Sequence, residues 1–433
     1  MTARPNVLVF GGLEFLVRAL TQHLIPPLPT EPLVAHIRVI DKYSINPPTT
    51  MISKELLGVL RDRADVIEYR QGNLANPTVV TKSFTDPAPN GLPYNYVVDA
   101  TGDVIPERPP EVYARTIFEV SVLIARASAA QLSRVPGSIQ AHIRYAAPFY
   151  EPPDLKRRYK ETDHDGWKPR GTRGVWWHET TRAVASVPGL PLVVLRTGLL
   201  YGEMYSRYEA AGFILLGLVY KHLGEDMRLL WSPELPKSSL NVYDFAGAIW
   251  KAAQWMSTKT RDEAEALAGA AIPPSYDPSV TSSIAPDAVP ASAGPVFAPV
   301  FNLADEGDTT QGRLGAVLSG LYGVKVRFQA LSDEVFSGMK LNEIVEEANL
   351  VHLEAWNEMI TRSKPPVPNT PLSPYMPLSL VEEHGYAIDG ERSRKILGYQ
   401  YRYPQLNEQA VCDYIDWCRR EGAWPETGLY IAP

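Results

Sequence analysis

Two short runs of titratable side chains could carry acid–base chemistry in this chain. Thr162-Asp163-His164-Asp165 places a histidine between carboxylates, and His178-Glu179 places one beside a carboxylate. A histidine can exchange a proton near neutral pH when a neighbouring group orients it. Asp–His clusters are also common in loop turns, so both a catalytic role and a turn remain open for Asp163 and His164.

The second run opens the sequence HETTR, which is similar at first sight to the zinc-binding helix of a metalloprotease. That motif needs a second histidine one helical turn further on, and Arg182 stands there instead. No metal site is therefore predicted. Adjacent residues point about 100° apart around a helix. We expect His178 and Glu179 to be surface or boundary residues, with catalysis by His178 as the alternative.

Alternating strand and helix patterns must position these side chains. Short apolar runs predict strands at 7–10, 36–41, 65–69, 96–100, 138–145 and 191–196, with helices between them. This order predicts an α/β fold with a doubly wound, mostly parallel sheet. Ligands bind such sheets at the carboxyl ends of the strands. Gly11-Gly12 follows the first strand, where a tight turn before a helix would lie.

The turn Phe10–Val17 (FGGLEFLV) resembles TGGxGFxG, the signature of the extended short-chain dehydrogenase/reductase superfamily, or NAD-dependent epimerase/dehydratase family. Further segments resemble that family in the same order along the chain: Asp41, 72–74, 100–102, 196–202, 241–246, 301–303 and 396–399. The resemblance implies a Rossmann sheet with a smaller C-terminal α/β substrate lobe, and NAD or NADP as cofactor. The cofactor-binding residues that it implies are Gly11, Gly12, Phe15, Asp41, Asn73, Leu74, Ala100, Thr101 and Gly102.

Two residues of the turn depart from the family signature. Glu14 and Val17 stand where the signature has its last two glycines. A carboxylate at Glu14 would point into the first helical turn, where the pyrophosphate should lie. Like charges about 4 Å apart repel by roughly 1 kcal/mol in water, and by several times that at a partly buried site. Glu14 could instead complement the helix dipole, worth about 0.3–1 kcal/mol. The two interpretations agree if no pyrophosphate binds there.

The family's catalytic Ser, Tyr and Lys are also replaced. The resemblance of YAAPFYE and TRGVWWHETTRAV to the family's segments places Ala146 at the serine, Arg173 at the tyrosine and Trp177 at the lysine. No tyrosine in the chain has a lysine four residues later. Without that lysine, a phenol with a pKa near 10 is a poor base at neutral pH.

Each replacement has more than one interpretation. Arg173 could bind a carboxylate or a phosphate bidentately. It could equally pair with Glu14 or Asp103. Trp177 could fill the nicotinamide space, or simply pack its helix against the sheet.

The chain divides into two predicted lobes and an insertion. Residues 1–200, with 238–257 and 297–304, are expected to form the Rossmann-like domain, and 201–237 and 305–433 the C-terminal lobe. Residues 258–296 are rich in Pro, Ala and Ser, so a surface insertion or flexible loop is predicted there. The amphipathic stretch 340–361 could cover the pocket, form an oligomer face or pack within the lobe.

Composition narrows the class of partner. The chain has 433 residues and a formal net charge of −7, which argues against a nucleic-acid partner. No apolar run approaches the roughly 18 residues of a membrane span. Its two cysteines, Cys412 and Cys418, suggest a reducing, cytoplasmic compartment.

Two functions from different classes follow from these observations. The first is a catalytically degenerate member of the family that binds a small molecule or a protein between its lobes. The second is an active NAD(P)-dependent epimerase, dehydratase or reductase on a nucleotide-sugar-like molecule, with Asp163, His164 or His178 in new roles. A non-redox reaction in the same cleft is a third class that the sequence neither favours nor excludes.

Overall fold

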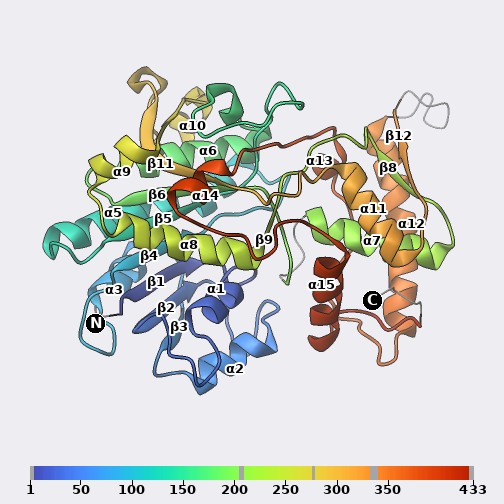
Figure 1. Cartoon of the computed structure of the whole chain (residues 1–433), viewed down its shortest axis with the longest axis horizontal. Coiled ribbons are helices and arrows are strands. Elements are labelled where there is room, and N and C mark those ends of the chain that lie inside the picture. Colours follow the sequence, from blue (N-terminus) through green and yellow to red (C-terminus); the bar gives the residue numbers. More distant parts are fainter. Residues whose placement is uncertain (1–3, 204–208, 276–277, 332–339, 429–433) are drawn as a thin grey trace.

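The larger of the two lobes is built around a mostly parallel sheet (Figure 1). The computed structural model describes residues 4–203, 209–275, 278–331 and 340–428. The eight-stranded sheet has the order β10-β11-β6-β5-β4-β1-β2-β3, and only the edge strand β10 runs antiparallel to its neighbour. Its strands are β1 (Asn6–Gly11), β2 (His36–Asp41), β3 (Ile67–Gln71), β4 (Tyr96–Ala100), β5 (Ala141–Ala146), β6 (Leu192–Thr197), β10 (Gly269–Ile272) and β11 (Val296–Leu303). The predicted doubly wound, mostly parallel α/β fold is confirmed (Figure 1).

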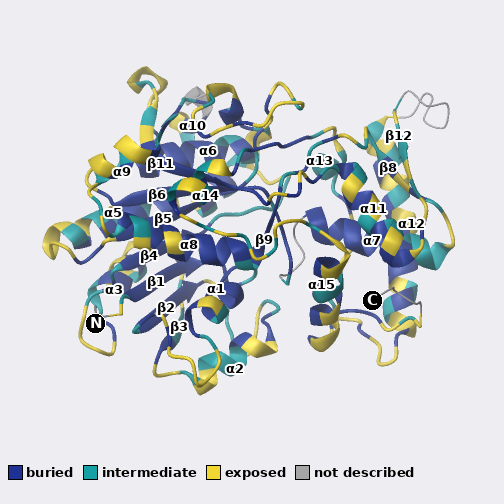
Figure 2. Cartoon of the chain, viewed as in Figure 1, coloured by how far each residue is buried: buried dark blue, intermediate teal, exposed yellow. Residues whose placement is uncertain are grey.

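Alternate residues of β1 build a core on each face of the sheet. Val7 and Val9 pack in the same cluster as helices α1 and α8, whereas Leu8 and Phe10 pack with α3 and α5. This alternation is the geometry of a strand that is buried on both faces. The helices of this domain are α1 (Val17–Leu24), α2 (Lys54–Asp62), α3 (Pro77–Thr85), α4 (Pro110–Tyr113), the π-helix η1 (Ala114–Glu119), α5 (Val120–Arg134), the 3-10 helix η2 (His164–Trp167), α6 (Gly171–Ala185) and α8 (Val242–Met256). Figure 2 shows the strands of the sheet buried beneath them.

The second lobe has a core of its own. Helices α7 (Glu209–Leu223), α11 (Gln311–Tyr322), α12 (Leu341–Arg362) and α15 (Glu408–Arg420) share one apolar cluster. Two short parallel pairs accompany them: β8 (Met227–Leu230) with β12 (Val326–Gln329), and β7 (Leu199–Tyr201) with β9 (Ser239–Asn241). The remaining helix α13 (Leu378–Val381) contacts α12, whereas α14 (Glu391–Ile396) packs against β11 of the large sheet.

The described residues of the segment 258–296, predicted as a surface insertion or a flexible loop, form regular secondary structure. The segment contains α9 (Arg261–Ala268), β10, α10 (Pro278–Ile284) and the 3-10 helix η3 (Ala291–Ala293). A capping box between Thr260 and Glu263 starts α9, and alanine is a strong helix former. β10 then pairs with β11, with Ala270 and Ile272 buried. Small side chains here pack at the sheet edge, so low apolar content did not mean disorder.

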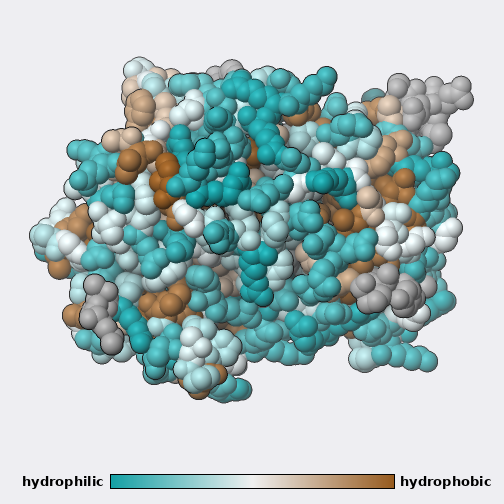
Figure 3. Space-filling view, viewed as in Figure 1, coloured by the Kyte–Doolittle hydropathy of each residue, from teal (hydrophilic) through white to brown (hydrophobic). Residues whose placement is uncertain are grey.

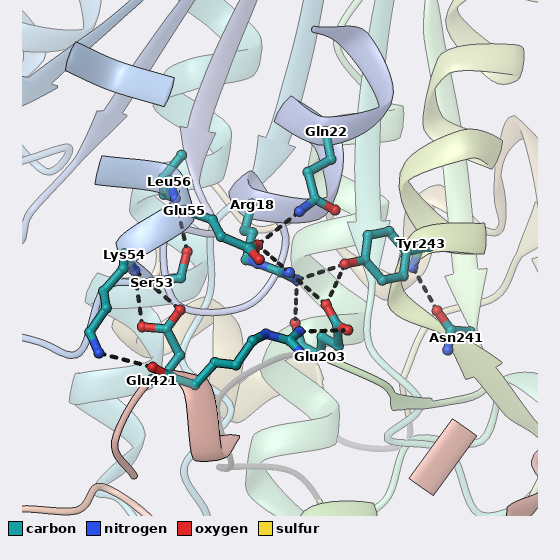
Figure 4. Close-up of polar contacts among 11 residues, drawn as sticks. Arg18, Gln22, Ser53, Lys54, Glu55, Leu56, Glu203, Asn241, Tyr243 and Glu421 are labelled. Carbon is teal, nitrogen blue, oxygen red and sulfur yellow. Dashed lines mark hydrogen bonds and ion pairs between the residues drawn. The ribbon is translucent and has the colours of Figure 1, made fainter. Parts of the chain in front are cut away.

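A polar cluster fastens the two lobes together beside α1. The buried Arg18 donates to the carboxylates of Glu55 and Glu203, and its Nη1 lies 2.8 Å from the Tyr243 hydroxyl (Figure 4). After α15, both carboxylate oxygens of Glu421 accept the Lys54 backbone N–H, at 3.0 and 3.2 Å. The C-terminal lobe therefore caps the N-terminus of α2 and contacts the helix that follows the glycine turn.

Hydrophilic side chains predominate on the face drawn in Figure 3, with apolar ones in small separate patches. None of the helices in the described ranges combines the length and the apolar character that a membrane span needs.

Candidate functional site

A cavity of about 540 Å³ lies at the carboxyl ends of β1, β2 and β4. Its walls bring together every residue that the sequence predicted for a cofactor. Gly11, Gly12, Phe15, Asp41, Asn73, Leu74, Ala100, Thr101 and Gly102 all line it. Pro371, from the C-terminal lobe, closes part of its rim. The strand ends of a doubly wound sheet are where such a cavity is expected.

The two glycines are required by the packing of their turn against the end of β4. Both have positive φ, at 71° for Gly11 and 77° for Gly12. An added Cβ would lie 3.0 Å from Thr101 Cγ2 at the first and 3.0 Å from Ala100 Cβ at the second. Residues 13–16 then form a turn, and the Val17 N–H bonds to the Gly12 carbonyl at 3.0 Å as α1 begins. Glu14 thus lies in the turn before α1, not in its first helical turn as expected.

The Glu14 carboxylate lines the cavity and is held by the loop after β2. It accepts hydrogen bonds from the Tyr43 hydroxyl at 3.0 Å and the Thr50 hydroxyl at 2.5 Å. Both partners also line the cavity. An ion pair between Glu14 and Arg173, which the sequence suggested, is not among the ion pairs of the described residues. A negative charge therefore stands on the glycine-turn side of the cavity, supported by two hydroxyl groups.

The Asp41 carboxylate is hydrogen-bonded to the backbone of the glycine turn and to that of its own neighbour. Its Oδ2 accepts the Leu13 N–H at 3.1 Å and its Oδ1 accepts the Lys42 N–H at 2.6 Å. The side chain is buried, and this burial raises the pKa of Asp41, to which the nearby Glu14 carboxylate adds; the two N–H groups act in the opposite direction. Asp41 thus fixes the turn and adds a second acidic group to this wall.

Trp177 fills the position that the resemblance assigns to the family's lysine. It is 2% exposed, and its indole Nε1 donates to the Asp103 carbonyl at 3.1 Å. A Cβ on Gly102 would lie 2.4 Å from the indole ring, so only glycine lets the two come this close. The ring also meets Tyr145 edge to face, with centroids 5.3 Å apart. The indole is therefore part of the wall behind Gly102.

Arg173 lies beside this aromatic group. Its guanidinium donates to the Val104 carbonyl and sits 3.9 Å from the centroid of the Phe149 ring. Burial lowers the pKa of Arg173 to about 10. It is not among the residues that line the cavity. Its packing against Phe149 combines a cation–π contact with a backbone hydrogen bond.

A buried ion pair beneath this region was not found from the sequence. Arg144 on β5 and Asp99 on β4 are both fully buried, with Arg144 Nη1 3.1 Å from Asp99 Oδ2. The same nitrogen donates to the Thr101 carbonyl at 2.8 Å, and Asp99 accepts the Thr101 N–H and hydroxyl. The pair thus fixes the loop after β4. Charged residues within the apolar strands HIRYA and YVVDA were the available signal.

The remaining predicted residues lie away from the cavity. Asp163 pairs with Arg157 at 2.8 Å and accepts the Lys160 N–H at 2.8 Å, and His164 is exposed in η2. Neither lines the cavity. The contacts of Asp163 are those of a residue in a loop turn.

The surface location expected for His178 and Glu179 is wrong, because both are fully buried. The His178 Nε2 lies 2.7 Å from the Pro273 carbonyl, and its ring packs between Tyr150 and Trp167. Burial lowers the pKa of His178 to about 4. Most residues of α6 are buried, on every side of the helix. The helix therefore has no exposed polar face from which its orientation could be predicted.

Residues missed by the sequence analysis form the outer wall of the cavity. Tyr43, Thr50, Arg108 and Arg115 line it, but they come from loops and a π-helix without a recognisable spacing. The described residues hold no group of three or more His, Cys, Asp or Glu that could bind a metal ion.

Comparison with known proteins agrees with this geometry. The sequence matches no protein-family model and no curated protein. The structure is similar to that of the Bordetella bronchiseptica enzyme WbmG in complex with NAD and UDP, with a TM-score of 0.58 and 12% identity over 98% of this chain and 97% of that one. It is also similar to DesIV, a dTDP-glucose 4,6-dehydratase from Streptomyces venezuelae with NAD bound (TM-score 0.57, 12% identity, 97% and 98% covered).

A third similar structure is the UDP-glucose 4-epimerase of Thermotoga maritima with UDP-glucose (TM-score 0.56, 14% identity, 96% and 99% covered). The likeness spans nearly the whole of each chain. At identities this low, it establishes the fold alone: the chain has the Rossmann-like fold that these three structures share.

Proposed function

We propose that this protein binds a nucleotide in the cavity beside Gly11 and Gly12 and does not carry out the redox chemistry of the epimerases and dehydratases whose fold it has. The observation that carries the proposal is the place of Trp177. Its indole is packed onto Gly102 and hydrogen-bonded to the Asp103 carbonyl, where the family resemblance calls for a lysine. An indole N–H donates a hydrogen bond but cannot lower the pKa of a neighbouring phenol by its charge.

The lining of the cavity suits the nucleoside part of NAD better than its pyrophosphate. Asn73, Leu74 and Ala100 offer an amide and apolar surface, as a base-binding wall requires. At the glycine turn, a pyrophosphate would meet the Glu14 carboxylate, with Asp41 beside it. We therefore derive no chemical step through a bound dinucleotide.

The ligands of the similar structures support the same ligand class. WbmG and DesIV were both solved with NAD, and WbmG also with UDP. NAD and UDP both contain a nucleotide. We extend that class, and not the reactions, to this chain.

An active enzyme that uses Asp163, His164 or His178 is less well supported. A catalytic acid or base must come within hydrogen-bonding reach of its substrate. Asp163 and His164 belong to an outer loop, and His178 is enclosed by Tyr150 and Trp167. The substrate would have to bind somewhere other than the cavity to reach them.

Binding and turnover measured on the same preparation test the proposal. Titration calorimetry with adenosine, AMP, NAD⁺ and NADPH should detect binding of at least one of them. Incubation of the protein with NAD⁺ or NADPH and a panel of nucleotide sugars should leave cofactor absorbance and sugar composition unchanged. If none of these four ligands binds, the proposal is wrong. Turnover that is lost in His164→Ala or His178→Ala would establish the enzyme instead.

A further inference from the structure

Acidic and basic side chains both line the cavity. Glu14 and Asp41 stand at the glycine turn, with Lys42 next to Asp41 in the chain, and Asp103, Arg108 and Arg115 come from the segment after β4. In a fold whose glycine turn normally faces a phosphate with helix N–H groups, this places the acidic groups where an anion would be expected. Two of the three basic groups, Arg108 and Arg115, come from the segment after β4, whereas Lys42 lies over the Tyr43 ring, 5.0 Å from its centroid.

Most of these charges already have partners within the protein. Glu14 accepts two hydroxyl hydrogen bonds, and Asp41 accepts two backbone N–H groups. Arg108 pairs with Asp103 at 2.9 Å. Arg115 is exposed, and no carboxylate of the described residues forms an ion pair with it. Its guanidinium is therefore available to an anionic ligand in the cavity.

The backbone around Arg115 has an unusual form. Arg115 is the second residue of the π-helix η1, and Thr116 and Val120 line the cavity with it. In a regular α-helix, residues five apart point about 140° away from each other. A π-helix bonds residue i to residue i+5 and is frequent at functional sites. The wide turn thus brings Arg115 and Val120 to the same wall.

We propose that Arg115 binds a phosphate group of the nucleotide, in place of the glycine turn. The inference rests on the proposed function, since it takes the cavity to hold a nucleotide. A guanidinium can donate two parallel hydrogen bonds to a phosphate. The Glu14 carboxylate would repel the same group. Attraction to Arg115 and repulsion by Glu14 therefore both favour a phosphate position beside η1.

Calorimetric titrations of adenosine and AMP into the wild type and Arg115→Gln test this assignment. In the wild type, AMP should bind at least tenfold more tightly than adenosine. In Arg115→Gln that ratio should fall below about threefold, while the affinity for adenosine stays unchanged. Arg61→Gln is the matched control, because Arg61 is exposed, pairs with Asp62 near the C-terminal end of α2 and does not line the cavity. Its AMP-to-adenosine ratio should equal that of the wild type.

The outcomes separate this inference from the proposed function. If adenosine binds but AMP has no advantage, or if the advantage survives in Arg115→Gln, the assignment of Arg115 is wrong and the nucleotide site stands. If neither ligand binds to the wild type, both proposals are overturned. Thermal unfolding curves of the two variants should match the wild type, since both arginines are exposed.

Discussion

Two neighbouring regions at the carboxyl edge of the sheet differ in how they are filled. We call the first the nucleotide half, after the ligand proposed for it, and define it by Gly11, Gly12 and Asp41; it borders a cavity with charged, polar and apolar lining. We call the second the catalytic half, because the family resemblance places catalytic residues at Arg173 and Trp177; it is filled by aromatic side chains that pack on the loop after β4. One edge of one sheet can therefore border an open cavity and, beside it, a packed core.

Truncating the indole gives the largest effect expected from this contrast. Trp177→Ala should lower the free energy of unfolding by about 3–5 kcal/mol, because a buried tryptophan leaves both a cavity and lost apolar burial. Urea denaturation followed by circular dichroism measures it. The matched control is Leu350→Ala, at a side chain 70% exposed, where less than about 0.5 kcal/mol is expected.

A loss below about 1 kcal/mol in Trp177→Ala would mean that the catalytic half is not part of the core. The contrast between the halves would then fail, and an open catalytic pocket would have to be considered again.

The pH dependence of stability tests the burial of His178, which follows Trp177 on α6. Burial lowers the pKa of His178 to about 4, and an unfolded histidine has a pKa near 6.5. The unfolded chain therefore takes up a proton that the folded chain excludes. The stability due to neutral His178 is complete above pH 6.5 and is lost as the pH falls toward 4.

Between pH 7 and pH 5, this one group should cost about 2 kcal/mol of unfolding free energy. His178→Gln keeps a donor for the Pro273 carbonyl and has no such titration. The difference between the two denaturation midpoints should therefore shrink as the pH is lowered. Parallel pH profiles for the two proteins would show that His178 reaches solvent in the folded state.

The fold was largely predictable from the sequence because its signals are local. Short apolar runs that alternate with helical patterns indicate a parallel sheet, and a glycine pair after the first strand indicates a tight turn. β2 and β4 begin and end at the residues predicted. The segment 258–296 was harder, because alanine and serine are as compatible with a packed edge as with a loop. Only the pairing of β10 with β11, which depends on tertiary contact, decides between them.

Neutralising Glu14 should sharpen the description of the nucleotide half. Glu14→Gln keeps groups that can bond to Tyr43 and Thr50 but removes the negative charge that faces a pyrophosphate. NAD⁺ should then bind about tenfold more tightly, or about 1.4 kcal/mol, as expected for one like-charge repulsion at a partly buried site. The affinity for adenosine should not change. Calorimetry with both ligands checks this, with Glu31→Gln at a distant exposed carboxylate as the control.

An unchanged NAD⁺ affinity in Glu14→Gln would show that the pyrophosphate does not approach the turn, or that the carboxylate is screened there. In that case the negative charge of Glu14 would not govern which nucleotide binds.

The cavity residues could be predicted only in part. Those at strand ends follow from the fold, since β1, β2 and β4 must end at the same edge. Arg115 could not be found in this way, because a π-helix shifts the side chains that follow it and the sequence carries no clear sign of the extra residue in the turn. His178 was misplaced for a related reason: burial on all sides of α6 comes from tertiary packing, which helical periodicity does not record.

The smallest effect is expected outside both halves, at the loop that first suggested catalysis. In Asp163→Ala/His164→Ala, the ion pair to Arg157 is lost, and exposed pairs contribute about 0.2–1 kcal/mol. Stability should fall by no more than that, and the affinity for adenosine or AMP should equal that of the wild type. Calorimetry and urea denaturation of the double variant check both. A tenfold loss of nucleotide affinity would place this loop over the cavity in solution, and the boundary of the nucleotide half would then have to include it.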